Sequence, residues 1–253
     1  MPVTYERSGA AAVLTIDRQE RRNAVDGPTA DELAEGYRRF TEDDEARVLV
    51  LTGAGGVAFC AGADLKAIES FGPRLDLEDG PLGFSRLISP KPAIAAISGW
   101  CLAGGLELAL WCDLRIVTED AKLGFTERRF GVPLIDGGTQ RLPRIVGLGR
   151  ALDMILTGRI VEAEEAERIG LVTEVVPAGT HLDRALEIAE GLAGFPQDTM
   201  LADRSAALEG IGLTLEEGLR MEARSALPTL QTAWAGAARF ASGEGRGGQG
   251  AGV

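Results

Sequence analysis

The segment that most constrains the fold is a run of 21 residues, Pro92 to Cys112, whose only charged member is Glu107. Its length would allow a transmembrane helix, which needs about 20 apolar residues. The run is broken, however, by Ser98-Gly99 and by Ala103-Gly104-Gly105, and an acid in the middle of a membrane is costly. We therefore expect a strand, a turn and a helix in a water-soluble core, and no membrane span.

Glu107 is flanked in this run by leucine and alanine residues. Poor solvation disfavours the charged form of a carboxyl and raises its pKa toward neutrality, which is how a general acid or base is made. The alternative is an exposed carboxylate that caps the N-terminus of the helix.

Two glycine-containing turns precede expected helix starts, at Ala61-Gly62-Ala63 and at Ala103-Gly104-Gly105. Backbone N–H groups at a helix start are unpaired, and the helix dipole favours negative charge there. The two turns could therefore converge on one oxyanion. The alternative is that the glycines only permit close packing.

Strand-like and helix-like segments alternate in the first half of the chain, which predicts an α/β core. The expected strands are residues 13–16, 47–52, 93–97 and 114–117. A helix is expected after Asp26, because Leu33, Tyr37 and Phe40 share one face. Glycines and prolines interrupt residues 71–90, a stretch of the kind that flanks binding sites. After about residue 149 the strand signal fades, and the expected helices are residues 151–156, 162–169, 181–192, 200–209 and 215–241.

Composition excludes several classes of protein. The 38 acidic and 26 basic residues give a net charge of −12, which has the wrong sign for a nucleic-acid partner. The single histidine, His181, excludes a multi-histidine metal site and is expected on the surface. Cys60, Cys101 and Cys112 lack the spacing of a disulfide framework and are expected to be small buried hydrophobes. The cysteine usage and the absence of a secretory signal predict a cytoplasmic protein.

A dinucleotide-binding motif is the main competing motif. Residues 53–58 fit the pattern G-x-G-x-x-A and follow an expected strand. Phe59 to Gly62 intervene before any helix, so we interpret residues 53–58 as a loop.

Several motifs in this chain resemble those of the crotonase, or enoyl-CoA hydratase/isomerase, superfamily, and the resemblance extends from about Val13 to Arg246. The motifs are Arg22-Asn23-Ala24, residues 59–66, residues 91–99, residues 103–109 and residues 138–143. The resemblance implies a crotonase-like spiral of ββα turns over residues 1–195, which would hold the acyl-CoA and catalytic site. It implies a helical C-terminal trimerisation region over residues 196–242, and we expect residues 243–253 to form a disordered tail. It also implies an acyl-CoA thioester substrate, no metal or redox cofactor, and a homotrimer or a dimer of trimers.

The same resemblance implies the roles of individual residues. The family's two oxyanion donors correspond to the backbone N–H groups of Ala63 and Gly104, which would hold the thioester carbonyl as it becomes an enolate. The positions that would line the coenzyme A pocket are Arg22, Ala24, Ala61, Asp64, Leu65 and Lys66. Lysine or arginine suits a ligand with phosphates, but Arg22 could also be a solvated surface charge.

Two glutamates distinguish a hydratase within the superfamily. Glu107 matches the first and Glu127 the second, with the hydratase spacing of 20 residues. Hydration of a conjugated double bond needs one group to deprotonate water and another to protonate the α carbon. We assign the water mainly to Glu107 and the α proton mainly to Glu127. Without the resemblance, Glu127 would be an ordinary surface acid beside two arginines.

Ile135 and Asp136 depart from the hydratase pattern, since glycine and alanine are usual at these positions. The bulk of Ile135 would shorten the acyl pocket, and Asp136 would place a third acid near the substrate. The sequence predicts an enoyl-CoA hydratase, with a double-bond isomerase or another crotonase-type thioester lyase as the enzymatic alternative. A non-catalytic acyl-CoA binder is a further alternative, although a pure binder needs neither the glutamate pair nor the oxyanion turns.

Overall fold

The computed structural model describes residues 1–244 and divides the chain into two compact units, Met1–Ala189 and Glu190–Val253. The boundary expected from the sequence lies after residue 195. The tail expected over residues 243–253 lies outside the described residues except for its first two positions.

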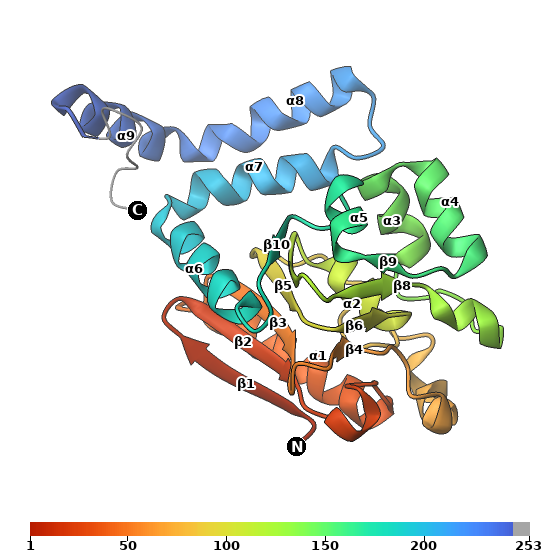
Figure 1. Cartoon of the computed structure of the whole chain (residues 1–253). Coiled ribbons are helices and arrows are strands. Elements are labelled where there is room, and N and C mark those ends of the chain that lie inside the picture. The colour runs from red at the N-terminus through yellow and green to blue at the C-terminus, as the bar shows by residue number, and fades with distance from the viewer. Residues whose placement is uncertain (245–253) are drawn as a thin grey trace. The chain divides into compact units, whose positions relative to one another are not determined.

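The first unit contains two sheets, and the larger has the strand order β1-β2-β3-β5-β7-β10 (Figure 1). Its strands are β1 (Val3–Ser8), β2 (Ala11–Ile16), β3 (Val48–Gly53), β5 (Ala93–Ile97), β7 (Leu114–Thr118) and β10 (Glu174–Val176). β1 pairs with β2 in antiparallel fashion, and all the other neighbours in this sheet are parallel. Every residue of β3 and β5 is buried, as their continuous apolar sequences predict.

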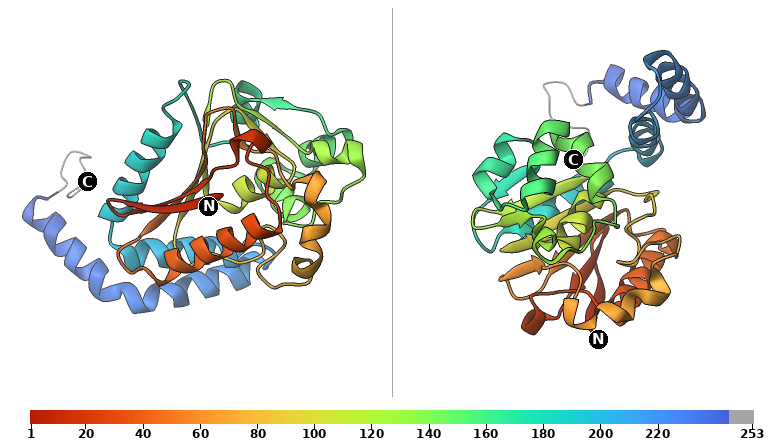
Figure 2. Two further views of the ribbon diagram at one scale, coloured as in Figure 1. Left: turned by 90° about the horizontal axis from the view of Figure 1, so that it is seen from below. Right: turned by 90° about the vertical axis from the view of Figure 1, so that its right-hand side faces the viewer.

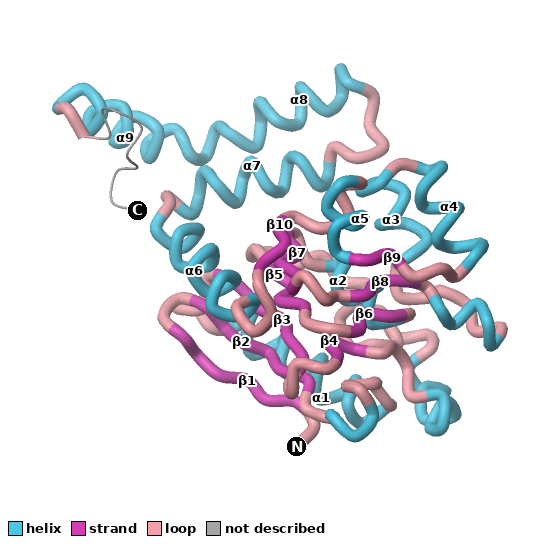
Figure 3. Tube along the Cα trace, viewed as in Figure 1, coloured by secondary structure: helices cyan, strands magenta, loops and turns pink. Residues whose placement is uncertain are grey.

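The smaller sheet has the order β4-β6-β8-β9 (Figure 3). Its strands are β4 (Ala58–Cys60), β6 (Trp100–Leu102), β8 (Lys122–Gly124) and β9 (Val161–Glu162). After a short turn, each of β3, β5 and β7 continues into a strand of this second sheet and then into a helix. Those helices are η2 (Leu65–Arg74), α2 (Gly104–Trp111) and η3 (Thr126–Phe130). The unit therefore repeats two strands and a helix, and the starts of η2, α2 and η3 all contribute residues to one cavity.

Gly99 makes the turn between β5 and β6. Its φ angle is +58°, and a Cβ atom there would lie 2.1 Å from the carbonyl oxygen of Val57. Only glycine fits a left-handed turn with so close a backbone neighbour. This is why the long apolar run becomes β5, β6 and α2 instead of one helix. No helix among residues 1–244 is long and apolar enough to cross a membrane.

Helix α1 (Gly27–Glu42) forms where the sequence predicts it. The Asp26 carboxylate accepts the N–H of Thr29 at 3.0 Å and caps the first turn. Leu33, Tyr37 and Phe40 are buried on one face, which packs against β1 and β2.

The remaining elements of the first unit follow β8. They are α3 (Gly138–Val146), α4 (Leu148–Thr157), α5 (Ala163–Arg168) and the start of α6 (His181–Gly194), while η1 (Gln19–Arg21) lies earlier in the chain. The expectation that strands end near residue 149 is wrong. β9 has only two residues, too few for any periodicity. β10 has only three residues, and its pairing partner β7 is distant in the sequence.

The second unit is helical, with α7 (Gln197–Glu209), α8 (Leu215–Ala226), η4 (Leu227–Thr229) and α9 (Leu230–Ser242). α7 and α8 lie side by side (Figure 2, blue). A single helix over residues 215–241 was expected, and this is wrong. Pro228 has no N–H group and its ring opposes a continuing helix, so the chain forms a short 3₁₀ turn there.

The cysteines and the histidine lie away from solvent to different degrees. Cys60, Cys101 and Cys112 are free and buried, as expected. His181 is half-buried at the first residue of α6, and not fully exposed as the sequence suggested.

Candidate active site

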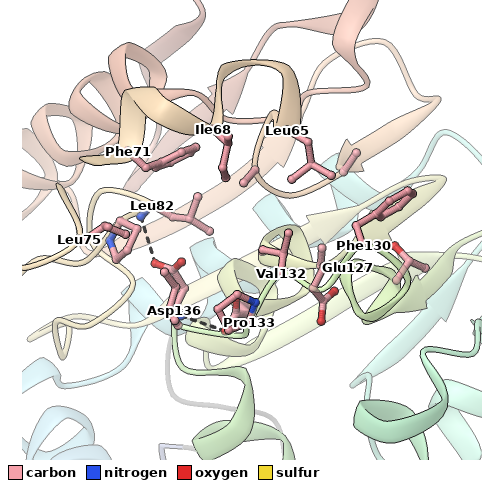
Figure 4. Close-up of a pocket in the computed structure, with 18 of the residues that line it drawn as sticks. Leu65, Ile68, Phe71, Leu75, Leu82, Glu127, Phe130, Val132, Pro133 and Asp136 are labelled. Carbon is pink, nitrogen blue, oxygen red and sulfur yellow. Dashed lines mark hydrogen bonds between the residues drawn. The ribbon is translucent and has the colours of Figure 1, made fainter. Parts of the chain in front are cut away.

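A cavity of about 360 Å³ lies in the first unit between η2 and the loop that follows η3. Leu65, Ile68 and Phe71 face Val132 and Pro133 across it (Figure 4). The glycine- and proline-rich stretch of residues 71–90 also contributes to the cavity wall, as expected from the sequence. The cavity is therefore mainly apolar, with a few polar groups in fixed places, as is typical of small-molecule sites.

The two glycine-containing turns meet at this cavity. A Cβ atom on Gly62 would lie 2.8 Å from the backbone nitrogen of Gly104, and a Cβ atom on Gly104 would lie 3.7 Å from the nitrogen of Ala63. Neither the Ala63 nor the Gly104 N–H donates a hydrogen bond to an acceptor within residues 1–244. Two free donors thus lie close together on the cavity wall, and the glycines serve both the close packing and the convergence.

Ala103 sets the direction of the second turn. Its φ and ψ angles are +52° and −127°, a conformation that costs an L-amino acid roughly 1–3 kcal/mol. This strained residue directly precedes Gly104, the first residue of α2.

Glu107 lies in the first turn of α2, and its side chain is buried. Its Oε1 accepts the backbone N–H of Asp136 at 3.0 Å and that of Gly138 at 2.8 Å. Burial raises the pKa of Glu107 to about 8, with a further contribution from the charge of Asp136 and a smaller one from Glu127. The interpretation of Glu107 as an exposed helix cap is therefore wrong.

Glu127 lies in the first turn of η3 and also lines the cavity (Figure 4). Its two carboxyl oxygens are buried and have no hydrogen-bond partner among the described residues. Burial raises the pKa of this carboxyl, while the nearby guanidinium of Arg128 opposes the shift. A buried carboxyl without a protein partner is costly for the fold and is characteristic of a functional site. Glu127 is not a surface acid.

Asp136 brings a third carboxyl to the cavity wall. Its Oδ1 accepts the N–H of Leu82 at 3.0 Å and the hydroxyl of Ser85. Burial raises the pKa of Asp136, and these hydrogen bonds together with the charges of Arg86 and Arg141 oppose that shift. Its neighbour Ile135 is 38% exposed and lines the cavity.

The residues assigned to coenzyme A fall into two groups. Ala61 and Leu65 line the cavity, whereas the others lie outside its lining: Arg22, Ala24, Asp64 and Lys66. Asp64 is buried, pairs with Arg18 at 3.3 Å and caps η2, so the structure gives it a local structural role. Arg22 and Lys66 are exposed, and Ala24 is buried.

Leu82 and Ser85 were not singled out from the sequence. Their connection to the site runs through Asp136, which is more than 50 positions away along the chain. No local pattern signals such a contact, and only the breaker-rich character of residues 71–90 hinted at it.

Comparisons with known proteins agree with one another. The family model described as enoyl-CoA hydratase/isomerase matches residues 6–242. The chain is 40% identical to (E)-benzylidenesuccinyl-CoA hydratase of Thauera aromatica, over 87% of each chain. It is 36% identical to crotonyl-CoA hydratase of Syntrophomonas wolfei, over 87% of this chain and 86% of that protein. The crystal structure of enoyl-CoA hydratase EchA1 from Mycobacterium marinum matches 95% of this chain and 96% of its own, with a TM-score of 0.89 and 33% identity.

Proposed function

The chain belongs to the enoyl-CoA hydratase/isomerase family, and from this premise we propose that it adds water reversibly across the α,β double bond of a 2-enoyl-CoA thioester. The crotonase-like fold with a helical C-terminal region, expected from the sequence, is confirmed. The observation that carries the proposal is that Glu107 and Glu127 line one cavity together with two free backbone donors.

The backbone N–H groups of Ala63 and Gly104 are the proposed oxyanion hole. The thioester carbonyl gains negative charge when a nucleophile adds at the β carbon, because the charge is delocalised to the oxygen as an enolate. Donors that are already oriented in an apolar cavity stabilise that charge, and each is worth about 3 kcal/mol of the barrier. These donors would also fix the direction in which the enoyl group enters the site.

The two carboxyls carry out the two proton transfers of the hydration. One carboxylate takes a proton from the water, whose oxygen forms the bond to the β carbon, and the other carboxyl gives its proton to the α carbon. The pair begins and ends with one proton, so the reaction is balanced and runs in both directions. We assign the water mainly to Glu107 and the α proton mainly to Glu127. Burial raises the pKa of both carboxyls, that of Glu107 to about 8, so the pair as a whole retains the one proton that it needs near neutral pH.

A double-bond isomerase is the second candidate, and the observation in its favour is Asp136. An isomerase moves one proton between two carbons, so one carboxyl can suffice, and the cavity holds a carboxyl beyond the glutamate pair. A non-catalytic acyl-CoA binder is disfavoured by Glu127. Its carboxyl is buried without a hydrogen-bond partner among the described residues, which destabilises the fold, and a protein that only binds acyl-CoA does not need this carboxyl.

Assembly and location are also part of the proposal. The second unit exposes many large apolar side chains, of which Leu215, Leu227, Trp234 and Phe240 are all more than 60% exposed. Apolar surface of this extent is typical of a subunit interface, so we propose a homotrimer or a dimer of trimers. We propose further that the enzyme is cytoplasmic, requires no separate cofactor and has no nucleic-acid partner.

The proposed function is tested by turnover of crotonyl-CoA, followed as loss of the conjugated enoyl absorbance. A 3-enoyl-CoA of equal length is assayed in parallel for isomerisation. Glu119→Gln, a change in an exposed acid outside the cavity, serves as the control. Hydration with little isomerisation supports the hydratase, isomerisation without hydration supports the second candidate, and binding without either reaction would favour the binder.

A further inference from the structure

Asp136 joins two parts of the site that are distant in the sequence. Its backbone N–H donates to Oε1 of Glu107 at 3.0 Å, while its own Oδ1 accepts the N–H of Leu82 at 3.0 Å and the hydroxyl of Ser85. The dashed line between Leu82 and Asp136 in Figure 4 marks one of these bonds. One residue thus connects the catalytic carboxyl on α2 with the wall segment, which we define as residues 75–92.

The wall segment in turn covers the oxyanion turn. A Cβ atom on Gly104 would lie 2.7 Å from Cδ1 of Leu82, so the Leu82 side chain packs directly over the first residue of α2. Leu82 also lines the cavity. A displacement of Leu82 would therefore change the surroundings of the oxyanion donor as well as the shape of the acyl site.

Two guanidinium groups brace the same junction. Arg141 on α3 donates to the carbonyl oxygen of Asp136 at 2.9 Å and to that of Ser85 at 2.6 Å. Arg86 in the wall segment donates to the carbonyl oxygen of Ile135 at 3.4 Å. Arginines from both α3 and the wall segment therefore stabilise the loop that carries Asp136.

The charges around Glu107 give Asp136 a second effect. Glu127 on η3 and Asp136 are the acids that face Glu107, and Arg141 on α3 is the nearby cation. Burial opposes ionisation of Asp136, but the hydrogen bonds to its Oδ1 and the two guanidinium groups favour its charged form. The charged form of Asp136 makes a second anion at Glu107 more costly.

We infer that Asp136 is a positioning residue for the hydration: it holds Glu107 and the wall segment in a fixed relation, and its negative charge opposes the ionisation of both glutamates at once. This inference rests on the proposed function. It assigns Asp136 no direct contact with the reacting atoms, and it explains why a third acid can be present in a hydratase.

Two substitutions separate the two effects. Asp136→Asn keeps an oxygen that can accept the bonds from Leu82 and Ser85 but removes the charge. Asp136→Ala removes both. The wall segment has other anchors that should keep these variants folded, because Phe84 is fully buried with its ring centroid 4.6 Å from that of Trp111, and Trp111 donates to the Leu87 carbonyl at 2.7 Å.

In Asp136→Asn, the alkaline limb of the kcat/KM profile for crotonyl-CoA should move to lower pH by about one unit, because a neighbouring like charge has been removed. Asp136→Ala should show this shift and also lose about tenfold or more in kcat, because Leu82 and Ser85 are no longer tied to the backbone segment whose N–H groups position Glu107. Asp79→Asn is the matched control, since Asp79 is an acid in the same segment that pairs with Arg74 at 2.9 Å and does not line the cavity. It should leave the alkaline limb where it is in the wild type.

An alkaline limb that is unmoved in folded Asp136→Asn would overturn the charge effect, and full kcat in Asp136→Ala would overturn the positioning effect. If Asp136→Ala does not fold, Ser85→Ala, which removes one of the two bonds to Oδ1, should lower kcat in its place, and an unchanged kcat would count against positioning. The pKa of Glu107 is also followed by carboxyl ¹³C NMR in wild type and Asp136→Asn. A shift seen by NMR in a protein that does not hydrate crotonyl-CoA would leave the inference about charge standing and defeat only the proposed function.

Discussion

The backbone N–H of Gly138, the first residue of α3, lies 2.8 Å from Oε1 of Glu107 in the first turn of α2. The start of α3 thus supports the carboxyl that α2 carries. A Cβ atom at Gly138 would lie 3.0 Å from that same oxygen and 2.9 Å from the ring of Phe125. The absence of a side chain at residue 138 is therefore a condition for the position of Glu107.

Gly138→Ala should lower kcat/KM for crotonyl-CoA by about tenfold or more, because the added methyl group displaces the Glu107 carboxyl while the N–H donor remains. Thermal unfolding should show that the variant is folded. Gly149→Ala is the matched control, since a Cβ atom there meets nothing within 4 Å and residue 149 lies in helix α4. Equal activity in the two variants would contradict this role of Gly138.

The raised pKa of Glu107 also predicts a dependence of stability on pH. Because the folded state holds this proton up to about pH 8 and the unfolded chain releases it near 4.5, the free energy of unfolding falls as pH rises through that window. Glu107→Gln removes this effect and keeps an oxygen for the two N–H donors. Urea unfolding should find the variant more stable than the wild type at pH 8.5 by at least about 1 kcal/mol, the value of one pKa unit, and nearly equal to it at pH 4. A variant less stable than the wild type at pH 8.5 would contradict the burial of an acid at this site.

The charge of the cavity predicts which acyl groups are accepted. Its lining contains four acids, Glu69, Glu107, Glu127 and Asp136, and no lysine, arginine or histidine among the described residues. An acyl chain that carries its own carboxylate would be repelled and would find no cation. Glutaconyl-CoA should therefore have a kcat/KM about 100-fold or more below that of crotonyl-CoA, the order expected when a charge is buried without a partner. Comparable values for the two thioesters would show that a cation from elsewhere reaches the site.

The apolar surface of the second unit predicts self-association of the chain. No large apolar residue of α7, α8 or α9 is buried within the chain, although each helix carries several of them. Light scattering should give a mass three or six times that of one chain, because association would bury these side chains. A monomer at micromolar concentration would mean that this surface has another purpose.

Local patterns in the sequence were sufficient for much of the fold. The apolar strands β3 and β5, the amphipathic helix α1 and the division of residues 92–112 all follow from residue order and turn chemistry. The short strand β9 and the break at Pro228 were missed, the first because two residues carry no period, and the second because apolar spacing was given more weight than a proline. β9 forms because it pairs with a strand that is distant in the sequence, whereas the helix ends near Pro228 because of local backbone chemistry.

The candidate site was predictable in part. Glu107 stood out because it is the one charge in an apolar run, whereas Glu127 has charged neighbours and was identified only through the family resemblance. The hydrogen bonds that fix Glu107, and those that tie Asp136 to Leu82 and Ser85, join segments far apart in the chain. Contacts of this kind depend on the assembled fold and leave no local signature in the sequence.

The central claim is that Glu107 and Glu127 act as one unit on one water molecule. The most direct measurement is the kcat of crotonyl-CoA hydration in Glu107→Gln, in Glu127→Gln and in the double variant, each checked for folding. Each single change should reduce kcat by about 100-fold or more, and the double change should cost far less than the product of the two single losses, because either loss alone disables the pair. Full hydration in Glu127→Gln, or losses that multiply in the double variant, would contradict a shared water and with it this account of the site.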